Sequence, residues 1–203
     1  MTQPNALETL KQYWGYDSFR GHQKAIIDSV LNGNDTIGLL PTGGGKSICY
    51  QIPGLIFPGL TMVISPLIAL MEDQHNGLIK RDIKSFHFKG SYSPRSLDEA
   101  FRNLRYGNYK FAFFAPERIA NPLFLEYIKH AHISLLAIDE AHCISQWGFD
   151  FRPSYLNVRI LRELRPDIPV LALTASATAR VKRDLHTQLN IPCLLYTSDA
   201  ADD

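Results

Sequence analysis

The sequence predicts an α/β fold in which helices flank a mostly parallel central sheet. Its short apolar runs are unbroken rather than alternating, which is typical of strands buried on both faces. Amphipathic stretches separate these runs, so strand and helix patterns alternate along the chain. The expected strands are Thr36–Leu40, Thr61–Ile64, a weaker Ser85–Phe88, Lys110–Phe114, Leu135–Ile138 and Val170–Leu173, and the expected helices are Arg20–Leu31, Lys46–Gln51, Leu67–Ile79, Pro94–Tyr106, Ser154–Arg165 and Ala177–Leu189.

Length and composition suit one domain, or one domain plus a fragment, because the chain has 203 residues of which 45% are hydrophobic. The formal net charge of +1 does not by itself indicate a nucleic-acid partner. Between Lys80 and Lys110, eight basic residues stand against three acidic ones, a balance of 8 − 3 = +5. This stretch has two open interpretations, a solvated helical face or a patch that tracks phosphates.

The cysteines Cys49, Cys143 and Cys193 are far apart, so the sequence indicates neither a disulfide framework nor a bound zinc ion. Asn5, Glu8 and Lys11 interrupt the start, which therefore lacks the apolar core of a signal peptide. No apolar run approaches the length of a membrane span. We expect a cytoplasmic protein without a membrane partner, associated with the nucleoid if it is bacterial.

A glycine-rich loop, Pro41–Ser47, follows the first expected strand and precedes a helix. Glycines let several backbone N–H groups point at a phosphate chain, and the helix adds the positive end of its dipole. Lys46 would reach the β- and γ-phosphates and the Ser47 hydroxyl would ligate Mg²⁺. Because Leu40 stands six residues before the lysine, the match is to the shorter Thr-Gly-x-Gly-Lys-Ser form. The candidate ATP contacts are Thr42, Gly43, Gly44, Gly45, Lys46 and Ser47.

An acidic pair, Asp139 and Glu140, directly follows the expected strand Leu135–Ile138. Acids at the carboxyl end of a parallel strand lie at the sheet edge where ligands bind. Asp139 would hold Mg²⁺ and Glu140 would polarise the attacking water, so we take Lys46, Asp139, Glu140 and His142 as the candidate catalytic residues. His142 has two interpretations, a structural histidine or a coupler between the ATP site and later segments.

These motifs resemble those of the RecQ DNA helicases. The most specific match is Asp139–His142 followed by the aromatic-rich loop Cys143–Pro153, in which Phe149 replaces a common histidine. The resemblance runs from about residue 7 to 192 and implies a RecA-like P-loop NTPase fold. It further implies an ATP- and Mg²⁺-dependent 3′ to 5′ helicase acting on single-stranded and duplex DNA in repair and recombination. Other matching segments are Leu10, Trp14-Gly15, Phe19-Arg20 and Gln23 (adenine recognition), Ser65–Gln74 (motif Ia), Ala115–Arg118 (motif Ib) and Thr174–Thr178 (motif III).

The family match assigns further contacts. An amide such as Gln23 can both donate to and accept from an adenine edge, with Phe19 or Trp14 as the stacking ring and Arg20 nearby. Aromatic rings and arginine bind single strands whatever their sequence, because every base has a π-face. The candidate DNA-binding and coupling residues are Gln146, Trp147, Phe149, Phe151, Arg152, Ser65, Thr174 and Thr178.

We expect residues 1–193 to form a first motor domain and residues 194–203 to be a non-native or disordered tail. The arginine finger, second motor domain, zinc-binding region and winged-helix region of the family are expected to be absent from this chain. The isolated chain should therefore bind ATP without unwinding DNA. Two alternatives stay open, an RNA helicase or non-unwinding translocase, and a module that only binds nucleotide or DNA.

Overall fold

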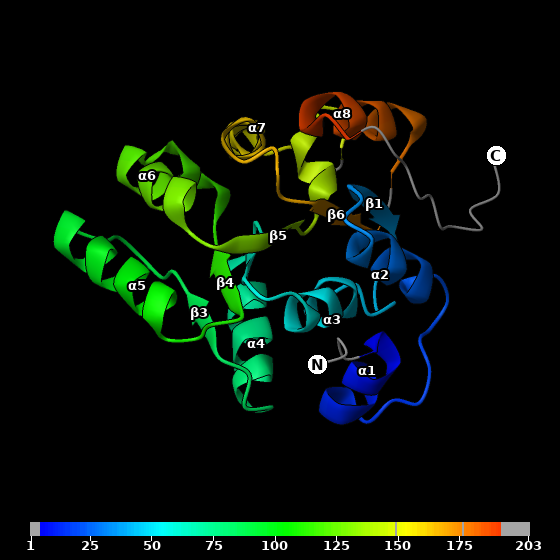
Figure 1. The fold of residues 1–203 in the computed structure, drawn as a ribbon. Coiled ribbons are helices and arrows are strands. Elements are labelled where there is room, and N and C mark those ends of the chain that lie inside the picture. Colours follow the sequence, from blue (N-terminus) through cyan, green and yellow to red (C-terminus); the bar gives the residue numbers. More distant parts are fainter. Residues whose placement is uncertain (1–4, 149, 176, 192–203) are drawn as a thin grey trace.

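A computed structural model describes residues 5–148, 150–175 and 177–191, so the expected tail 194–203 lies outside the described residues. Six strands form one sheet in the order β1-β6-β5-β2-β4-β3, and every neighbouring pair is parallel (Figure 1). The predicted parallel α/β fold is therefore confirmed. The strands are β1 (Thr36–Leu39), β2 (Leu60–Ile64), β3 (Ser85–His87), β4 (Phe111–Phe114), β5 (Ile133–Ile138) and β6 (Val170–Thr174).

Helices cover both faces of the sheet (Figure 1). Side chains alternate along each strand, so in β5 Leu136 and Ile138 face one core while Leu135 and Ala137 face the other. The first core receives apolar residues from α5 to α8 and the second from α2 to α4. The helices are α1 (Ala6–Trp14), α2 (Gln23–Leu31), α3 (Ile48–Ile56), α4 (Ile68–Ile79), α5 (Pro94–Tyr106), α6 (Pro122–His130), α7 (Val158–Leu164) and α8 (Ala179–Leu189).

Two helices were not predicted. Helix α1 begins with a capping box, in which the Asn5 side chain accepts from the backbone of the first turn and Glu8 accepts from the Asn5 N–H. It packs Leu10 against α2 and α3 in a third cluster. Helix α6 begins at Asn121, whose side chain accepts from two backbone N–H groups, and Pro122 occupies the first helical position. Both starts follow ordinary capping rules, so the sequence contained the signal.

Two predicted helices differ most from the observed ones, while α2 begins at Gln23 instead of Arg20 and α8 at Ala179 instead of Ala177. Helix α3 begins at Ile48, since Lys46 and Ser47 belong to the turn, and it continues past Pro53 to Ile56. Pro53 lacks an N–H, so it leaves one carbonyl of the preceding turn without its helical bond. The predicted helix Ser154–Arg165 is instead a 3₁₀ segment, Pro153–Asn157, followed by α7. A second 3₁₀ segment, Pro116–Ala120, follows β4, and a third, Ala141–Ile144, follows the acidic pair.

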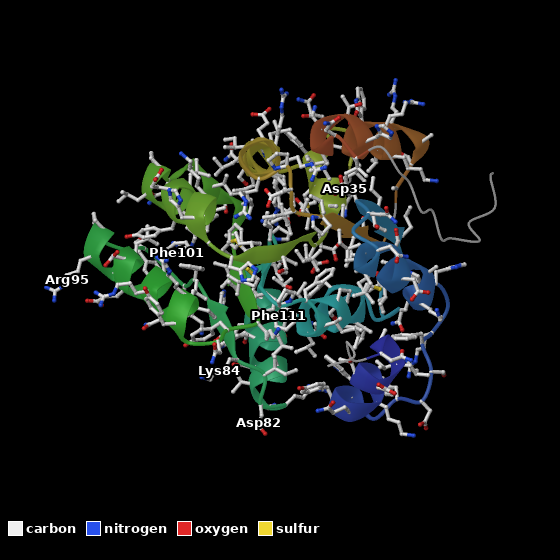
Figure 2. The ribbon with its side chains drawn as sticks, viewed as in Figure 1. Asp35, Asp82, Lys84, Arg95, Phe101 and Phe111 are labelled. Carbon is white, nitrogen blue, oxygen red and sulfur yellow. The ribbon has the colours of Figure 1, made fainter. Side chains whose placement is uncertain are left out.

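The basic stretch 80–110 does not form a single patch. Lys110 donates to the Phe57 carbonyl, Lys84 donates to the Gly107 carbonyl, and Lys89 pairs with Glu72. Figure 2 shows Lys84 and Arg95 at well separated places on the surface. These contacts favour the interpretation of a structural and solvated face. Within the described ranges, the helices are all too short or too polar to cross a bilayer.

Candidate nucleotide site and nucleic-acid surface

The carboxyl ends of three adjacent strands bring the main candidate residues together. In the order β1-β6-β5, the loop 40–47 follows β1, Thr174 ends β6, and the acidic pair follows β5. Because the strands are parallel and in contact, these segments share one edge of the sheet. The sequence alone placed each segment after a strand, and the strand order now makes them neighbours.

The phosphate loop has a backbone that its glycines require. Gly43 and Gly45 have φ angles of +79° and +72°, in the left-handed region that favours glycine. At Gly44 an added Cβ would lie 2.9 Å from the Pro41 carbonyl oxygen, where the Gly44 N–H also bonds back. The loop then leads into α3 without a side-chain cap at Ser47. The N–H groups of Ile48, Cys49 and Tyr50 bond back to the carbonyls of Gly45, Lys46 and Ser47, so an anion here would meet the N–H groups of the preceding loop and the positive end of the helix dipole.

Lys46 and Glu140 join the phosphate loop to the acidic pair. The Lys46 Nζ lies 2.8 Å from Glu140 Oε1, although 94 residues separate them in the sequence, and both side chains are largely buried. Glu140 has a φ of +47°, a conformation unusual for a side-chain-bearing residue. Strained backbone of this kind often marks functional sites, because the surrounding structure must hold it in place. The predicted nearness of Lys46 and Glu140 is present in the structure.

Asp139 is a buried carboxylate, with 8% of its surface exposed. Its Oδ1 accepts from the Glu140 N–H at 3.0 Å, and its carbonyl accepts from the buried Tyr155 hydroxyl at 2.9 Å. Burial raises the pKa of Asp139 to about 6, the Glu140 charge adds to the rise, and Lys46 opposes it. A nearby cation would remove most of this penalty, so Asp139 is suited to a divalent ion.

His142 connects the acidic pair to β6. Its Nδ1 lies 2.9 Å from the Thr174 hydroxyl oxygen and 3.4 Å from Glu140 Oε2. One imidazole thus touches a candidate catalytic acid and the end of the strand that leads to α8. Both of its interpretations, coupler and structural histidine, are compatible with these two contacts.

A cavity of about 340 Å³ opens beside the phosphate loop, between α2, α3 and α4. Gln23 lies in its wall and is only 4% exposed, and its Nε2 donates to the Gly44 and Gly45 carbonyls at 3.0 and 3.1 Å. Its Oε1 accepts from the Arg20 N–H at 3.0 Å. Gln23 therefore holds the phosphate loop here, a role the sequence reasoning did not anticipate.

Of the two rings that the sequence offered for the base, Trp14 lines this cavity and Phe19 does not, and the unpredicted Tyr16 lines it as well. Phe19 packs against the cluster around Leu10, whereas Tyr16 and Trp14 line the cavity. The Arg20 guanidinium lies 5.4 Å from the centroid of the exposed Tyr16 ring. Tyr16 was missed because its spacing alone gives no functional signal. An exposed tyrosine close to Arg20 and a glycine-rich loop could have suggested it.

The aromatic loop is exposed where it was expected to be. Trp147 is 62% exposed, Gln146 is exposed and Phe151 is half-buried, while Phe149 lies outside the described residues. The Arg152 guanidinium donates to Asp150 and to the Pro66 carbonyl, which ties the loop to the segment after β2.

A cavity of about 350 Å³ lies between these segments, lined by Pro66, Leu67, Glu140, His142, Cys143 and Asp150. It connects the acidic pair with the base of the aromatic loop. The remaining candidates differ in position. Ser65 is 2% exposed and its hydroxyl has no partner within the described residues, while Leu67 and Ile68 beside it are exposed. Thr174 is buried, and Thr178 caps the first turn of α8.

Known proteins resemble this chain in sequence and in fold. The family model described as DEAD/DEAH box helicase matches residues 20–185. The ATP-dependent DNA helicase RecQ of Haemophilus influenzae is 43% identical over 93% of this chain and 30% of its own length. The protein of the same name from Bacillus subtilis is 46% identical over 92% of this chain and 32% of its own length. This chain thus spans about a third of these relatives.

A solved structure agrees on the fold. The Hef helicase domain of Pyrococcus furiosus superposes with a TM-score of 0.68 over 91% of this chain and 39% of that chain, at 21% identity. At this identity the likeness shows the fold alone, and it supports the expected RecA-like arrangement of strands and helices.

Proposed function

Because this chain belongs to the DEAD/DEAH box helicase family, we propose that it is the ATP-binding motor domain of a RecQ-like 3′ to 5′ DNA helicase. One observation carries the proposal most directly: Lys46 of the phosphate loop contacts Glu140 of the acidic pair at 2.8 Å. The two halves of a phosphoryl-transfer site therefore meet in one place. Such a site needs a cation for the phosphates and a base that orients water.

In the proposed cycle, the loop Thr42–Ser47 binds the phosphates through backbone N–H groups. Lys46 then moves from Glu140 to the β- and γ-phosphates, where its charge is most strongly attracted. Glu140, released from the pair, orients the attacking water as a general base. Its unusual backbone conformation directs it toward the loop rather than along β5. The Lys46–Glu140 contact is thus the resting position of two catalytic groups.

A magnesium ion fits the residues present. The Asp139 carboxylate and the Ser47 hydroxyl offer the oxygen donors that Mg²⁺ prefers, alongside water and phosphate. The raised pKa of the buried Asp139 supports this assignment, because a carboxylate so desolvated is stabilised by a cation. When bound, the ion would neutralise charge that develops on the phosphates.

For the nucleotide base, we propose the cavity between α2 and α4. To recognise the adenine edge, the Gln23 amide would leave the Gly44 and Gly45 carbonyls to which it donates here. Tyr16 and Arg20 supply an aromatic face and a guanidinium plane beside it. This assignment makes Tyr16 the stacking ring in place of the predicted Phe19 or Trp14, whose ring is approached by the Arg81 guanidinium at 5.6 Å.

For the nucleic acid, we propose the exposed aromatic loop. Trp147 and Phe151 offer rings for bases, with Gln146 beside them, and Arg152 offers a cation once it leaves Asp150. Leu67 and Ile68 extend this surface along the segment after β2, whereas Ser65 lies buried beneath it with its N–H bonded to the Phe114 carbonyl. The contact from His142 to Thr174 supports coupling between this surface and the ATP site.

The proposal for the whole enzyme goes beyond this chain, which spans about a third of its RecQ relatives. Unwinding, the strand polarity and work in DNA repair or recombination are proposed on the strength of those relatives. The same holds for residues 1–193 as a first motor domain. The alternative of an RNA helicase or translocase has no specific observation in its favour.

The test is ATP turnover by this chain alone, with a single-stranded DNA, and with an RNA of the same sequence. We expect slow turnover that depends on Lys46 and responds to DNA more than to RNA. A response to RNA alone would contradict the DNA assignment. Absence of ATP binding by the folded chain would contradict the assignment of the site.

A further inference from the structure

Two residues of α8 contact the aromatic loop in ways that the proposed function does not use. The Ser145 hydroxyl donates to Asp184 Oδ2 at 2.5 Å, and the Ser145 oxygen accepts from the Trp147 N–H at 3.1 Å. The Arg180 guanidinium lies 4.3 Å from the centroid of the Trp147 ring. Arg180 and Asp184 are one helical turn apart, so they present one face of α8 to the loop.

These contacts orient both the backbone and the ring of Trp147. Ser145 is buried while Trp147 is 62% exposed, so the serine anchors the loop and the ring projects from it. A guanidinium within about 6 Å of an indole face is attracted by the ring's quadrupole. The tryptophan therefore has a preferred position, although it is on the surface and outside the apolar core.

The loop has little freedom at its base. The Gly148 N–H donates to the Ser145 carbonyl at 2.9 Å, and a Cβ at Gly148 would lie 2.3 Å from the His142 carbonyl oxygen. The chain thus turns tightly over the 3₁₀ segment, with Trp147 inside the turn between Ser145 and Gly148. Any shift of α8 would be transmitted to the ring through Asp184 and Ser145.

We infer that α8 is the docking site of the aromatic loop, with Arg180 and Asp184 as positioning residues that hold Trp147 ready for a base of a single strand. The connection from β6 to α8 begins at Thr174, which contacts His142, and the middle of α8 contacts Ser145 through Asp184. A base that stacks on the Trp147 face displaces Arg180 from it. The freed guanidinium then lies beside the strand's phosphate. The inference rests on the proposed function for the identity of this ligand.

The test uses the fluorescence of Trp147 in the 203-residue chain. The sequence has two tryptophans, so Trp14→Phe leaves Trp147 as the only one. In this background, Arg180→Ala should increase acrylamide quenching of Trp147 by about twofold, because one of two ring faces loses its cover. The matched control is Arg183→Ala, which removes the same side chain from an exposed position on the same helix. Equal quenching in both variants would overturn the docking site.

Asp184 gives a second, independent measurement. Asp184→Ala should increase quenching, while Asp184→Asn keeps an oxygen that accepts from Ser145 and should restore most of the protection. If Asn and Ala behave alike while thermal melting stays unchanged, the Ser145 contact does not position the loop and the inference fails. Restored protection in Asn but not in Ala would support it even if Arg180→Ala lowered the melting temperature.

A titration with a thymidine oligonucleotide separates this inference from the proposed function. We expect saturable quenching of Trp147, with a loss of several-fold in affinity when Arg180 is replaced by Ala. If acrylamide reveals docking but the oligonucleotide leaves Trp147 unaffected, the docking site stands and the nucleic-acid role of the loop fails. If neither effect appears, the inference itself is wrong.

Discussion

Replacing Glu140 by Gln should tighten ATP binding, whereas replacing Lys46 by Ala should weaken it strongly. The opposite signs follow from the contact at 2.8 Å between the two side chains. In the absence of nucleotide, Glu140 holds the Lys46 ammonium, so ATP must displace the carboxylate to obtain the same cation. Glu140→Gln keeps the shape and removes the competing charge.

The structure bounds both magnitudes. The side chains of Lys46 and Glu140 are 14% and 21% exposed, so their ion pair is partly buried. Breaking this pair costs ATP binding about 1 kcal/mol. That energy corresponds to roughly fivefold tighter binding in Glu140→Gln. Lys46→Ala removes a charge-assisted contact to phosphate, which costs about 2–3 kcal/mol or roughly 30–150-fold in affinity.

The assay is titration calorimetry with ATP and Mg²⁺, run at one pH on folded variants. The matched control is Glu163→Gln, which makes the same change in the exposed ion pair with Arg159 and should leave affinity unchanged. Weaker ATP binding by Glu140→Gln, comparable to that of Lys46→Ala, would refute the competition. In that case Glu140 would help to form the binding site instead of restraining Lys46.

Three further predictions follow from other contacts. Burial raises the pKa of Asp139 to about 6, so the folded state binds more protons than the unfolded state between about pH 4 and pH 6. The contribution of Asp139 to the free energy of unfolding therefore falls as the pH rises through that window. Without Mg²⁺, Asp139→Asn should therefore raise the free energy of unfolding at pH 7 by about 1–3 kcal/mol and change it little near pH 4. Denaturant melts at the two pH values measure this difference, and equal effects at both would contradict the raised pKa of Asp139. Gly148→Ala should destabilise the chain by about 1–3 kcal/mol, because the added Cβ would meet the His142 carbonyl oxygen. A thermal melt measures this loss, and an unchanged melting temperature would show that the loop can relax. Gln23→Ala should weaken ATP more than GTP, and an equal loss would assign Gln23 to the phosphate loop alone.

The sequence predicted the sheet well because buried parallel strands have an unmistakable pattern. All six expected strands occur, with ends shifted by at most two residues, for example Leu135–Ile138 against Ile133–Ile138. Helix α6 was missed although Asn121 and Pro122 form a standard start. Helix α1 was missed although Asn5 and Glu8 form a capping box at its start. Helix ends near Pro53 depended on tertiary packing, which overrides the local cost of proline.

The candidate site was predictable where chemistry requires a fixed spacing. The loop Pro41–Ser47 and the acids after β5 could be placed at one sheet edge from their positions after strands. The partners of individual side chains could not. Nothing in the sequence indicates that Gln23 bonds to Gly44 and Gly45, or that Asp184 accepts from Ser145, because these contacts join segments that only the fold brings together.

The most direct test of the nucleotide site is a structure of this chain with Mg²⁺ and a non-hydrolysable ATP analogue. The triphosphate should lie over the backbone N–H groups of Gly43–Ser47. Lys46 should have left Glu140 for the β- and γ-phosphates, with the ion held by Asp139 and Ser47 and the base beside Tyr16 and Arg20. A nucleotide bound elsewhere, or one bound here with the Lys46–Glu140 contact unchanged, would contradict this assignment.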